Sequence, residues 1–119
     1  MGGKSDLAGR QCVPCRGGVL PLDAPEQESL MGGLDEGWKT VGGHHLEREF
    51  TFKNFRQAMA LANAIAEIAE SQRHHPEMLV GWGRLRVRLF THVIDGLHEN
   101  DFILAAKIDS LCRLLGLSD

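Results

Sequence analysis

Residues 54–76 read NFRQAMALANAIAEIAESQRHHP, and they set the architecture by predicting one long helix with a defined start and end. Asn54 can cap the first turn, because a short polar side chain accepts a hydrogen bond from a free backbone N–H group there. Apolar side chains then recur every three or four residues, which gives the helix one face to bury. Pro76 cannot continue the helix, because it lacks an N–H donor. The prediction is a helix from Phe55 to about Arg73.

Two pairs of strands flank this helix in the sequence. Residues 38–52 predict a strand, a turn at Gly42 and Gly43, and a second strand in which apolar and polar side chains alternate. Residues 78–82 and 84–92 predict a hairpin whose second strand alternates Leu or Val with Arg. Alternation of this kind indicates strands with one face on a core.

Arginines form a basic stripe on the outer face of the last predicted strand, at Arg84, Arg86 and Arg88. Such a stripe could contact acidic groups on a partner. Glu47 and Glu49 have the same outward parity on another strand, so cross-strand ion pairs account for the stripe more simply.

Shorter helices are predicted at residues 25–31 and 101–115, and Cys112 in the second packs as a small apolar side chain. The order αββαββα favours an α+β two-layer sandwich, with a four-stranded antiparallel sheet and helices packed on one face. We expect this domain to span residues 25–119. Residues 1–24 hold a CxxC motif among Gly and Pro residues, and we expect them to be extended or loosely ordered.

The composition is that of one ordinary soluble domain, with 119 residues, 43% hydrophobic and 24% charged side chains. A formal net charge of -3 gives no electrostatic reason to expect nucleic acid as a partner. No run approaches the roughly twenty apolar residues of a membrane span, and the polar start lacks a signal-peptide hydrophobic region. The prediction is a cytoplasmic protein without a membrane partner.

Three of the six histidines stand at the predicted ends of elements. His74 and His75 follow the long helix, whose negative end favours their protonated forms, and Glu70 is within reach of His74 at i, i+4 spacing. His92 is expected at the end of the fourth strand. Asp101 opens the last helix, whose positive end favours an ionised carboxylate. Because imidazoles titrate near pH ~6.5, such a cluster can supply both a proton donor and a proton acceptor.

Other uses of these histidines remain open. Each one alone also fits a structural role, as a surface residue, a strand-end residue or a helix cap, but their joint placement favours acid-base chemistry. Metal binding is the rival function. Consecutive His74 and His75 cannot easily face one ion, and the segment lacks the ligand spacing typical of zinc sites, so no metal is predicted here.

Cys12 and Cys15 form a single CxxC motif, which His44 and His45 could complete as a metal site. One such pair without a preceding strand is weak support for a redox or metal function. A structural role is favoured, and disulfides are not expected.

The chain resembles the pterin-4a-carbinolamine dehydratases over about residues 25–115. The resemblance rests on three motifs at set distances: His74-His75-Pro76, Thr91-His92 and Gly96-Leu97-x-x-x-Asp101. The αββαββα order is also the fold of that family. Trp82-Gly83 and Asn100-Asp101-Phe102 resemble bacterial members that accompany phenylalanine hydroxylase. Many animal members have an acidic residue and an aromatic residue where this chain has Arg73 and Met78, so substrate contacts are expected to differ more than proton transfer.

The resemblance implies removal of water from 4a-hydroxytetrahydrobiopterin to give quinonoid dihydropterin, which recycles the cofactor of aromatic amino acid hydroxylases. It implies neither a metal nor an organic cofactor. The catalytic set that it implies is His74, His75 and His92. The implied supporting or substrate-binding residues are Glu70, Asp101, Trp82 and Pro76.

A second function of another class is protein binding by the same fold. Relatives act as a dimerisation cofactor of a transcription factor or, with a similar cysteine-containing tail, assist assembly of the carbon-fixing carboxylase. The expected partners are therefore a pterin substrate and, as alternatives, an aromatic amino acid hydroxylase or a carboxylase subunit. The resemblance also implies a homodimer or homotetramer, for which an exposed strand edge gives a physical reason.

Overall fold

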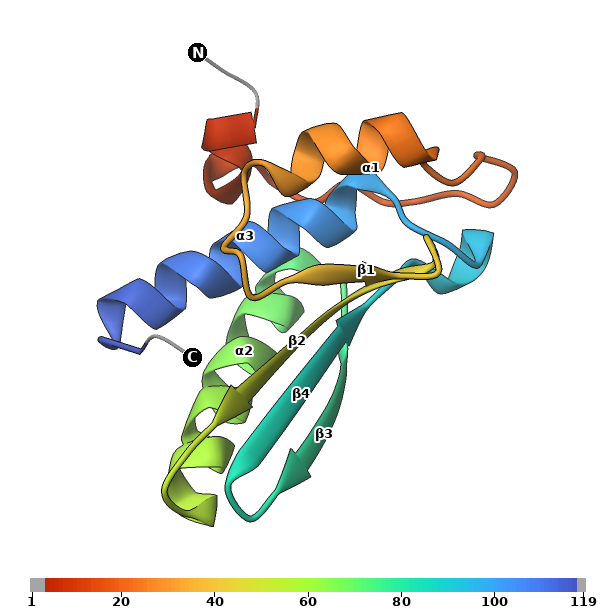
Figure 1. The fold of residues 1–119 in the computed structure, drawn as a ribbon. Helices are drawn as coiled ribbons and strands as arrows, with labels where there is room; N and C mark the ends of the chain where they lie inside the picture. Colours follow the sequence, from red (N-terminus) through yellow and green to blue (C-terminus); the bar gives the residue numbers. More distant parts are fainter. Residues whose placement is uncertain (1–3, 118–119) are drawn as a thin grey trace.

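A computed structural model describes residues 4–117 and contains a four-stranded antiparallel sheet with α2 and α3 on one face (Figure 1). The helices are α1 (Ala24–Met31), α2 (Phe55–Gln72) and α3 (Glu99–Leu114), and the strands are β1 (Lys39–Val41), β2 (His45–Thr51), β3 (Glu77–Gly81) and β4 (Arg84–Leu89). Two 3-10 helices, η1 (Lys4–Gly9) and η2 (His92–Ile94), complete the order. The predicted α+β class and αββαββα order are confirmed.

The strands lie in the order β1-β2-β4-β3, so the two hairpins meet at β2 and β4 in the centre of the sheet. β2 pairs with β4 from Leu46 opposite Leu89 to Thr51 opposite Arg84. The turn between β1 and β2 depends on Gly42 and Gly43, whose φ angles of 58° and 68° suit glycine and a tight hairpin.

α2 begins and ends within a residue or so of its predicted bounds. Asn54 Oδ1 accepts a hydrogen bond from the Gln57 backbone N–H at 2.8 Å, which is the predicted cap. The buried face of the helix consists of Ala58, Leu61, Ala62, Ile65 and Ala69. Phe55, the first apolar residue of the helical pattern, lies in the first turn of α2 and is 49% exposed, so it is not part of this face. None of the helices within residues 4–117 has both the length and the apolar character to cross a membrane.

Part of the N-terminal segment is more regular than the expected extended or loosely ordered chain, of which residues 1–3 lie outside the described residues. Residues 4–9 form η1, and Leu7 is fully buried in the core. Further along, the Leu22 backbone N–H donates to the Leu97 carbonyl at 2.9 Å, and Asp23 caps α1. The segment has no periodic pattern of its own. It is held on the domain by one buried apolar side chain and by hydrogen bonds to residues distant in the sequence.

A charged pair is buried between the sheet and α3. Arg48 on β2 is 2% exposed, and its guanidinium donates to Asp109 Oδ1 at 2.6 Å. The indole N–H of Trp38 donates to the same oxygen at 2.8 Å. The backbone N–H of Asp35 donates to the other carboxylate oxygen at 2.8 Å. This network accommodates the arginine that interrupts the apolar side of β2.

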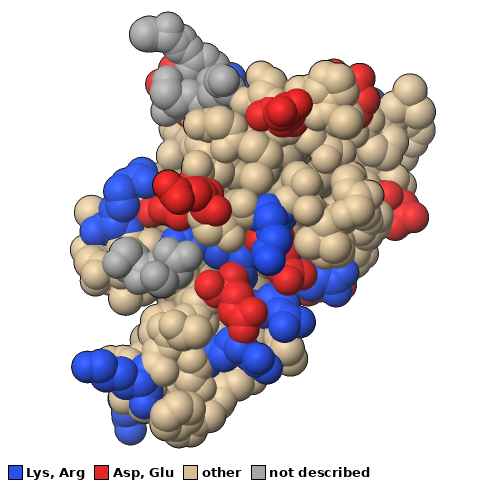
Figure 2. Space-filling view, viewed as in Figure 1, with Lys and Arg blue, Asp and Glu red and all other residues tan. Residues whose placement is uncertain are grey.

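The outer face of the sheet carries the predicted ion pairs. Arg84 lies 3.2 Å from Glu49, and Arg86 lies 3.9 Å from both Glu47 and Glu49, as predicted. Arg88 pairs instead with Glu77 on β3, at 3.0 Å, which was not a predicted partner. Figure 2 shows basic and acidic side chains interleaved over this face. The prediction of cross-strand pairing is confirmed, and the arginine stripe is largely neutralised.

Candidate active site

The end of α2 turns His74 and His75 in different directions. Arg73 adopts a left-handed conformation with φ 54°, and the His74 backbone N–H donates to the Ala69 carbonyl at 3.2 Å. This is the usual way to end a helix, although glycine normally occupies the left-handed position. Pro76 follows and leads the chain into β3. The two imidazoles therefore leave one turn with separate partners.

His74 is held by a buried carboxylate at the start of α3. His74 Nε2–H donates to Asp101 Oδ1 at 2.6 Å, and Asp101 is fully buried. The Thr91 hydroxyl and the His98 backbone N–H donate to the second oxygen of Asp101 at 2.8 and 3.0 Å. Three donors at the first turn of a helix suit a charged carboxylate. Because His74 uses Nε2, its Nδ1 is the nitrogen left for a substrate.

Glu70 pairs with His75 and not, as expected from i, i+4 spacing, with His74. His75 Nε2 lies 2.7 Å from Glu70 Oε2, and both side chains are exposed. The expectation was wrong because the left-handed residue Arg73 breaks the helical geometry before His74. Asp101 supplies the partner of His74 instead.

His92 lies in a closed loop and not at the end of a strand. β4 ends at Leu89, and the Thr91 backbone N–H donates to the Gly96 carbonyl at 2.8 Å. The bridge between Thr91 and Gly96 closes a loop, and His92 is the first residue of η2 within that loop, where it is exposed. The expectation that His92 ends a strand was therefore wrong. Gly96 is needed here because a Cβ atom would lie 2.8 Å from the Pro21 side chain.

Aromatic packing supports His92 within this loop. The Phe90 ring lies 4.3 Å from the His92 ring and 4.7 Å from the His44 ring, measured between centroids. His44 Nε2 also lies 2.8 Å from Asp95 Oδ1, at the end of the same loop. The turn between β1 and β2 thereby contacts the loop that carries His92.

The three predicted catalytic histidines line one cavity of about 340 Å³, here called the histidine cavity. Its wall consists of Cys15, Arg73, His74, His75, Pro76, Phe90, Thr91, His92 and Val93. Glu70 and Asp101 stand behind two of the histidines as hydrogen-bond partners. Imidazoles from two distant segments therefore meet in one cavity that solvent can reach, as the acid-base hypothesis requires.

Trp82 is not part of this arrangement. It lies in the turn between β3 and β4, is 72% exposed, and lines a separate surface hollow with Asn54 and Phe55. Its substrate-binding role stays a prediction without support from the positions of the histidines.

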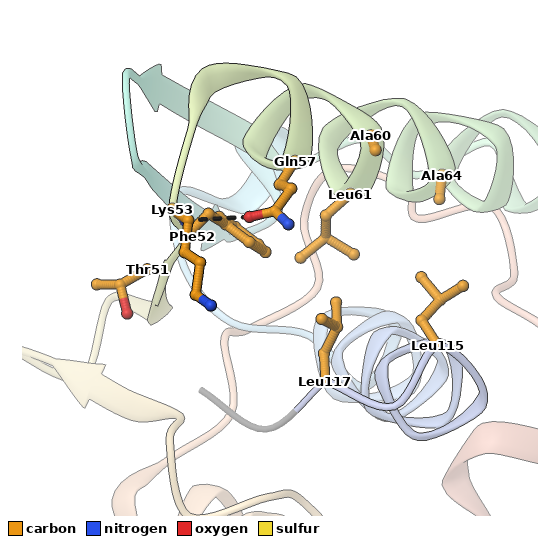
Figure 3. Close-up of a pocket in the computed structure, with 9 residues that line it drawn as sticks. All are labelled: Thr51, Phe52, Lys53, Gln57, Ala60, Leu61, Ala64, Leu115 and Leu117. Atoms are coloured by element: carbon orange, nitrogen blue, oxygen red, sulfur yellow. Dashed lines mark hydrogen bonds between the residues drawn. The ribbon is translucent and has the colours of Figure 1, made fainter.

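A larger cavity of about 670 Å³ lies between α2 and the end of α3 (Figure 3). Its wall is mostly apolar, including Leu61, Leu115 and Leu117, and among the residues that the structure describes Lys53 is the only titratable side chain in it. A single lysine offers no matched donor and acceptor for acid-base chemistry. The smaller histidine cavity is therefore the candidate active site.

The thiols of the CxxC motif are poor nucleophiles. Burial raises the pKa of Cys12 to about 11, although Lys107 opposes the shift. Burial, with a contribution from Asp101, also raises the pKa of Cys15. Both thiols are therefore mostly protonated at neutral pH. Among residues 4–117 no three His, Cys, Asp or Glu side chains form a metal-binding group, so the alternative set with His44 is not assembled there.

Sequence reasoning missed three parts of this site. Thr91 was seen beside His92, but its contact with Asp101 depends on closure of the loop. Phe90 belongs to the wall through a stack that no spacing rule predicts. Cys15 reaches the wall from the N-terminal segment, which gave no local signal.

Comparison with known proteins identifies the family. Residues 20–111 match the sequence profile described as pterin 4 alpha carbinolamine dehydratase. The chain is 52% identical over 107 residues to a candidate pterin-4-alpha-carbinolamine dehydratase of Rubrobacter xylanophilus, covering 90% of this chain and 99% of that protein. A similar protein of Alkaliphilus metalliredigens is 49% identical over 105 residues, covering 88% and 95%. The chain belongs to the pterin-4a-carbinolamine dehydratase family.

Solved structures agree with this assignment. A transcriptional coactivator/pterin dehydratase from Brucella melitensis superposes with a TM-score of 0.70 at 33% identity, covering 76% of this chain and 97% of that one. A pterin dehydratase-like protein identified as a RuBisCO assembly factor in the alpha-carboxysome gives a TM-score of 0.54 at 24% identity, covering 64% and 89%. The second likeness shows the fold alone.

Proposed function

We propose that this protein removes water from 4a-hydroxytetrahydropterins by histidine acid-base catalysis, giving the quinonoid dihydropterin and so recycling the cofactor of aromatic amino acid hydroxylases. The observation that carries the proposal is the wall that His74, His75 and His92 share. The cavity volume of about 340 Å³ falls in the range of small-molecule sites, roughly 300–1,000 Å³. Family membership supports a pterin as the ligand.

The chemistry needs one proton donor and one proton acceptor. The C4a–O bond breaks, and the departing hydroxyl group takes a proton to leave as water. The neighbouring ring nitrogen gives up its proton, and the electron pair of that N–H bond forms the new C=N bond. An imidazolium can supply the first proton and a neutral imidazole can accept the second, as general acid and general base.

The carboxylates act as positioning groups in this proposal. Asp101 and Glu70 each accept the Nε2 proton of one histidine, at 2.6 and 2.7 Å. Holding that tautomer directs Nδ1 toward the substrate and stabilises the imidazolium when it forms. His92 is held by ring packing on Phe90, so the set contains histidines in two kinds of environment.

The direct test is the rate at which quinonoid dihydropterin forms from a 4a-hydroxytetrahydropterin, compared with the spontaneous reaction. Wild-type protein should accelerate the reaction, and His75→Ala or His92→Ala should lower kcat/KM by about 100-fold, the range of general acid-base catalysis. Circular dichroism should show that both variants are folded. Glu70→Gln should lower the rate less, and Glu67→Gln, an exposed change on the same helix, serves as its control.

A protein-binding function is the other outcome of this test. Wild-type protein that gives no acceleration, yet co-purifies with a carboxylase subunit or a hydroxylase, would replace the catalytic proposal. Acceleration that survives both histidine substitutions would refute the assigned residues and leave the dehydratase activity standing.

A further inference from the structure

A second cavity adjoins the histidine cavity. Its volume is about 400 Å³, and it shares Cys15, Arg73 and His74 with the histidine cavity as common wall residues. The remaining wall comes from the N-terminal segment around Val13, from the last turn of α2 and from Asn100 in the first turn of α3. We call it the N-terminal cavity. A ligand whose ring lies in the first cavity can extend a substituent into the second.

The N-terminal cavity is held open by specific hydrogen bonds. The Val13 backbone N–H donates to Asn100 Oδ1 at 2.9 Å, and Asn100 Nδ2 donates back to the Val13 carbonyl at 2.6 Å. Gln72 Oε1 accepts from the Cys12 backbone N–H at 2.8 Å, and Gln72 Nε2 donates to Gln11 Oε1 at 3.0 Å. Asn100 is 2% exposed, so this anchor is buried. The segment is therefore a fixed wall of the cavity.

Arg73 gives this cavity its charge. The amides of Gln72 and Asn100 are already used in holding the segment, and no Asp or Glu belongs to the described wall. The two thiols stay mostly protonated, since burial raises the pKa of both Cys12 and Cys15. Arg73 is exposed and belongs to the walls of both cavities, and among the described residues no carboxylate forms an ion pair with it. A guanidinium in this position favours an anionic group that can accept two parallel hydrogen bonds.

We propose that the N-terminal cavity binds the 6-substituent of the pterin and that Arg73 selects substituents ending in an anionic group, a phosphate ester or a carboxylate. This inference rests on the proposed function, because it places the pterin ring in the histidine cavity. It extends that function by naming the substrate class. Arg73 thus acts as a specificity residue, and His74, on the shared wall, serves both cavities.

The test uses pairs of unreactive 7,8-dihydropterins that differ only in charge. One pair carries a 6-trihydroxypropyl group with and without a terminal phosphate ester, and the other carries a 6-alkyl chain ending in a carboxylate or its amide. Calorimetry gives the Kd of each. Wild-type protein should bind the phosphate ester about ten-fold more tightly than its neutral partner, the size expected for a charge-assisted bidentate contact. The preference should shrink as salt is raised.

Substitutions locate the preference. Arg73→Gln should bring the ratio of the two Kd values close to one, whereas Arg56→Gln, at the other end of α2, should leave it unchanged. Gln11→Glu keeps the oxygen that accepts from Gln72 and adds a negative charge in the N-terminal cavity alone, so it should lower the ratio below that of wild type.

Equal Kd values for the neutral and anionic compounds in wild-type protein would overturn the inference, and so would a preference that survives Arg73→Gln. A preference for the carboxylate pair alone would assign the anion as a carboxylate. The same compounds as 4a-hydroxytetrahydropterins separate this inference from the proposed function. Dehydration without charge preference would refute only the inference, and charge-selective binding without dehydration would refute only the catalysis.

Discussion

Two buried carboxylates on α3, two turns apart, lie in opposite kinds of surroundings. Asp101 in the first turn is bonded to His74, whose imidazole lines a cavity open to solvent. Asp109 is bonded to Arg48 and Trp38 inside the core, and each of those side chains is at most 3% exposed. One carboxylate is connected to the candidate active site and the other only to the core. Burial of a charged side chain therefore does not by itself indicate a functional site. A buried carboxylate is a better candidate when the side chain bonded to it lines a cavity that solvent can reach.

Asp109→Asn should give the largest effect on stability. It removes the charge that balances Arg48, and a second carboxylate beside Arg48, that of Asp35, lies 3.4 Å away and is open to solvent. Removing one member of a buried pair costs about 3 kcal/mol or more in the free energy of unfolding. Urea denaturation should show this loss. Activity per folded molecule should stay close to wild type, because the histidine cavity is untouched.

The double variant Arg48→Met/Asp109→Leu is the control for that prediction. Burial raises the pKa of Asp109 even with Arg48 beside it, in line with the general cost of removing a charged pair from water. Replacing both charges with apolar side chains should therefore recover much of the stability that Asp109→Asn loses. A double variant no more stable than the single one would mean that the cost comes from packing and not from the unbalanced charge.

Asp101→Asn is the matched change at the other end of the comparison. The amide can still accept from Thr91 and the His98 N–H, so the free energy of unfolding should fall by only about 1 kcal/mol. The amide cannot stabilise an imidazolium at His74, so kcat/KM for dehydration should fall by about 100-fold. A large stability loss with activity retained would assign Asp101 to the fold, as we assign Asp109.

The same contrast explains what the sequence could and could not predict. Local patterns predicted the αββαββα order and both ends of α2, through the spacing of apolar residues, the helix caps and Pro76. They also singled out His74, His75 and His92 as candidate site residues. The partner of each buried charge does not follow from such patterns, because Arg48 meets Asp109 and His74 meets Asp101 through contacts 61 and 27 residues apart. Glu70 was assigned to the wrong histidine because one left-handed residue redirected the chain. Leu7 lies in the core and Cys15 in the wall of the histidine cavity, and no periodic pattern in the N-terminal segment predicted either position.

His45 is a buried basic side chain that contacts neither Asp101 nor Asp109. It is 8% exposed, and burial lowers its pKa below the ordinary value of 6.5, with Arg88 and His44 contributing. Glu47, 3.6 Å away, opposes the shift. Because the folded state favours the neutral ring, the contribution of His45 to stability is present above pH 6.5 and is lost as the pH falls through the lowered pKa.

The corresponding measurement is the free energy of unfolding of wild type and His45→Gln between about pH 7 and pH 5. Wild type should lose more stability over that range than His45→Gln, because glutamine does not titrate. Parallel curves for the two proteins would show that protonation of His45 does not oppose folding.

Arg84→Ala should have the smallest effect, since its ion pair with Glu49 is open to water on both sides. The side chains are 51% and 38% exposed, and the distance is 3.2 Å. Exposed pairs contribute roughly 0.2–1 kcal/mol before screening, so the change in the free energy of unfolding should be under about 0.5 kcal/mol. It should vanish in about 1 M salt, where the screening length is about 3 Å. The loss caused by Asp109→Asn should persist in that salt, because a buried pair is screened far less. If salt abolished the stability losses of both Arg84→Ala and Asp109→Asn, ions would have to screen the network around Asp109. That network would then behave like an exposed ion pair, and the contrast between the two regions would fail.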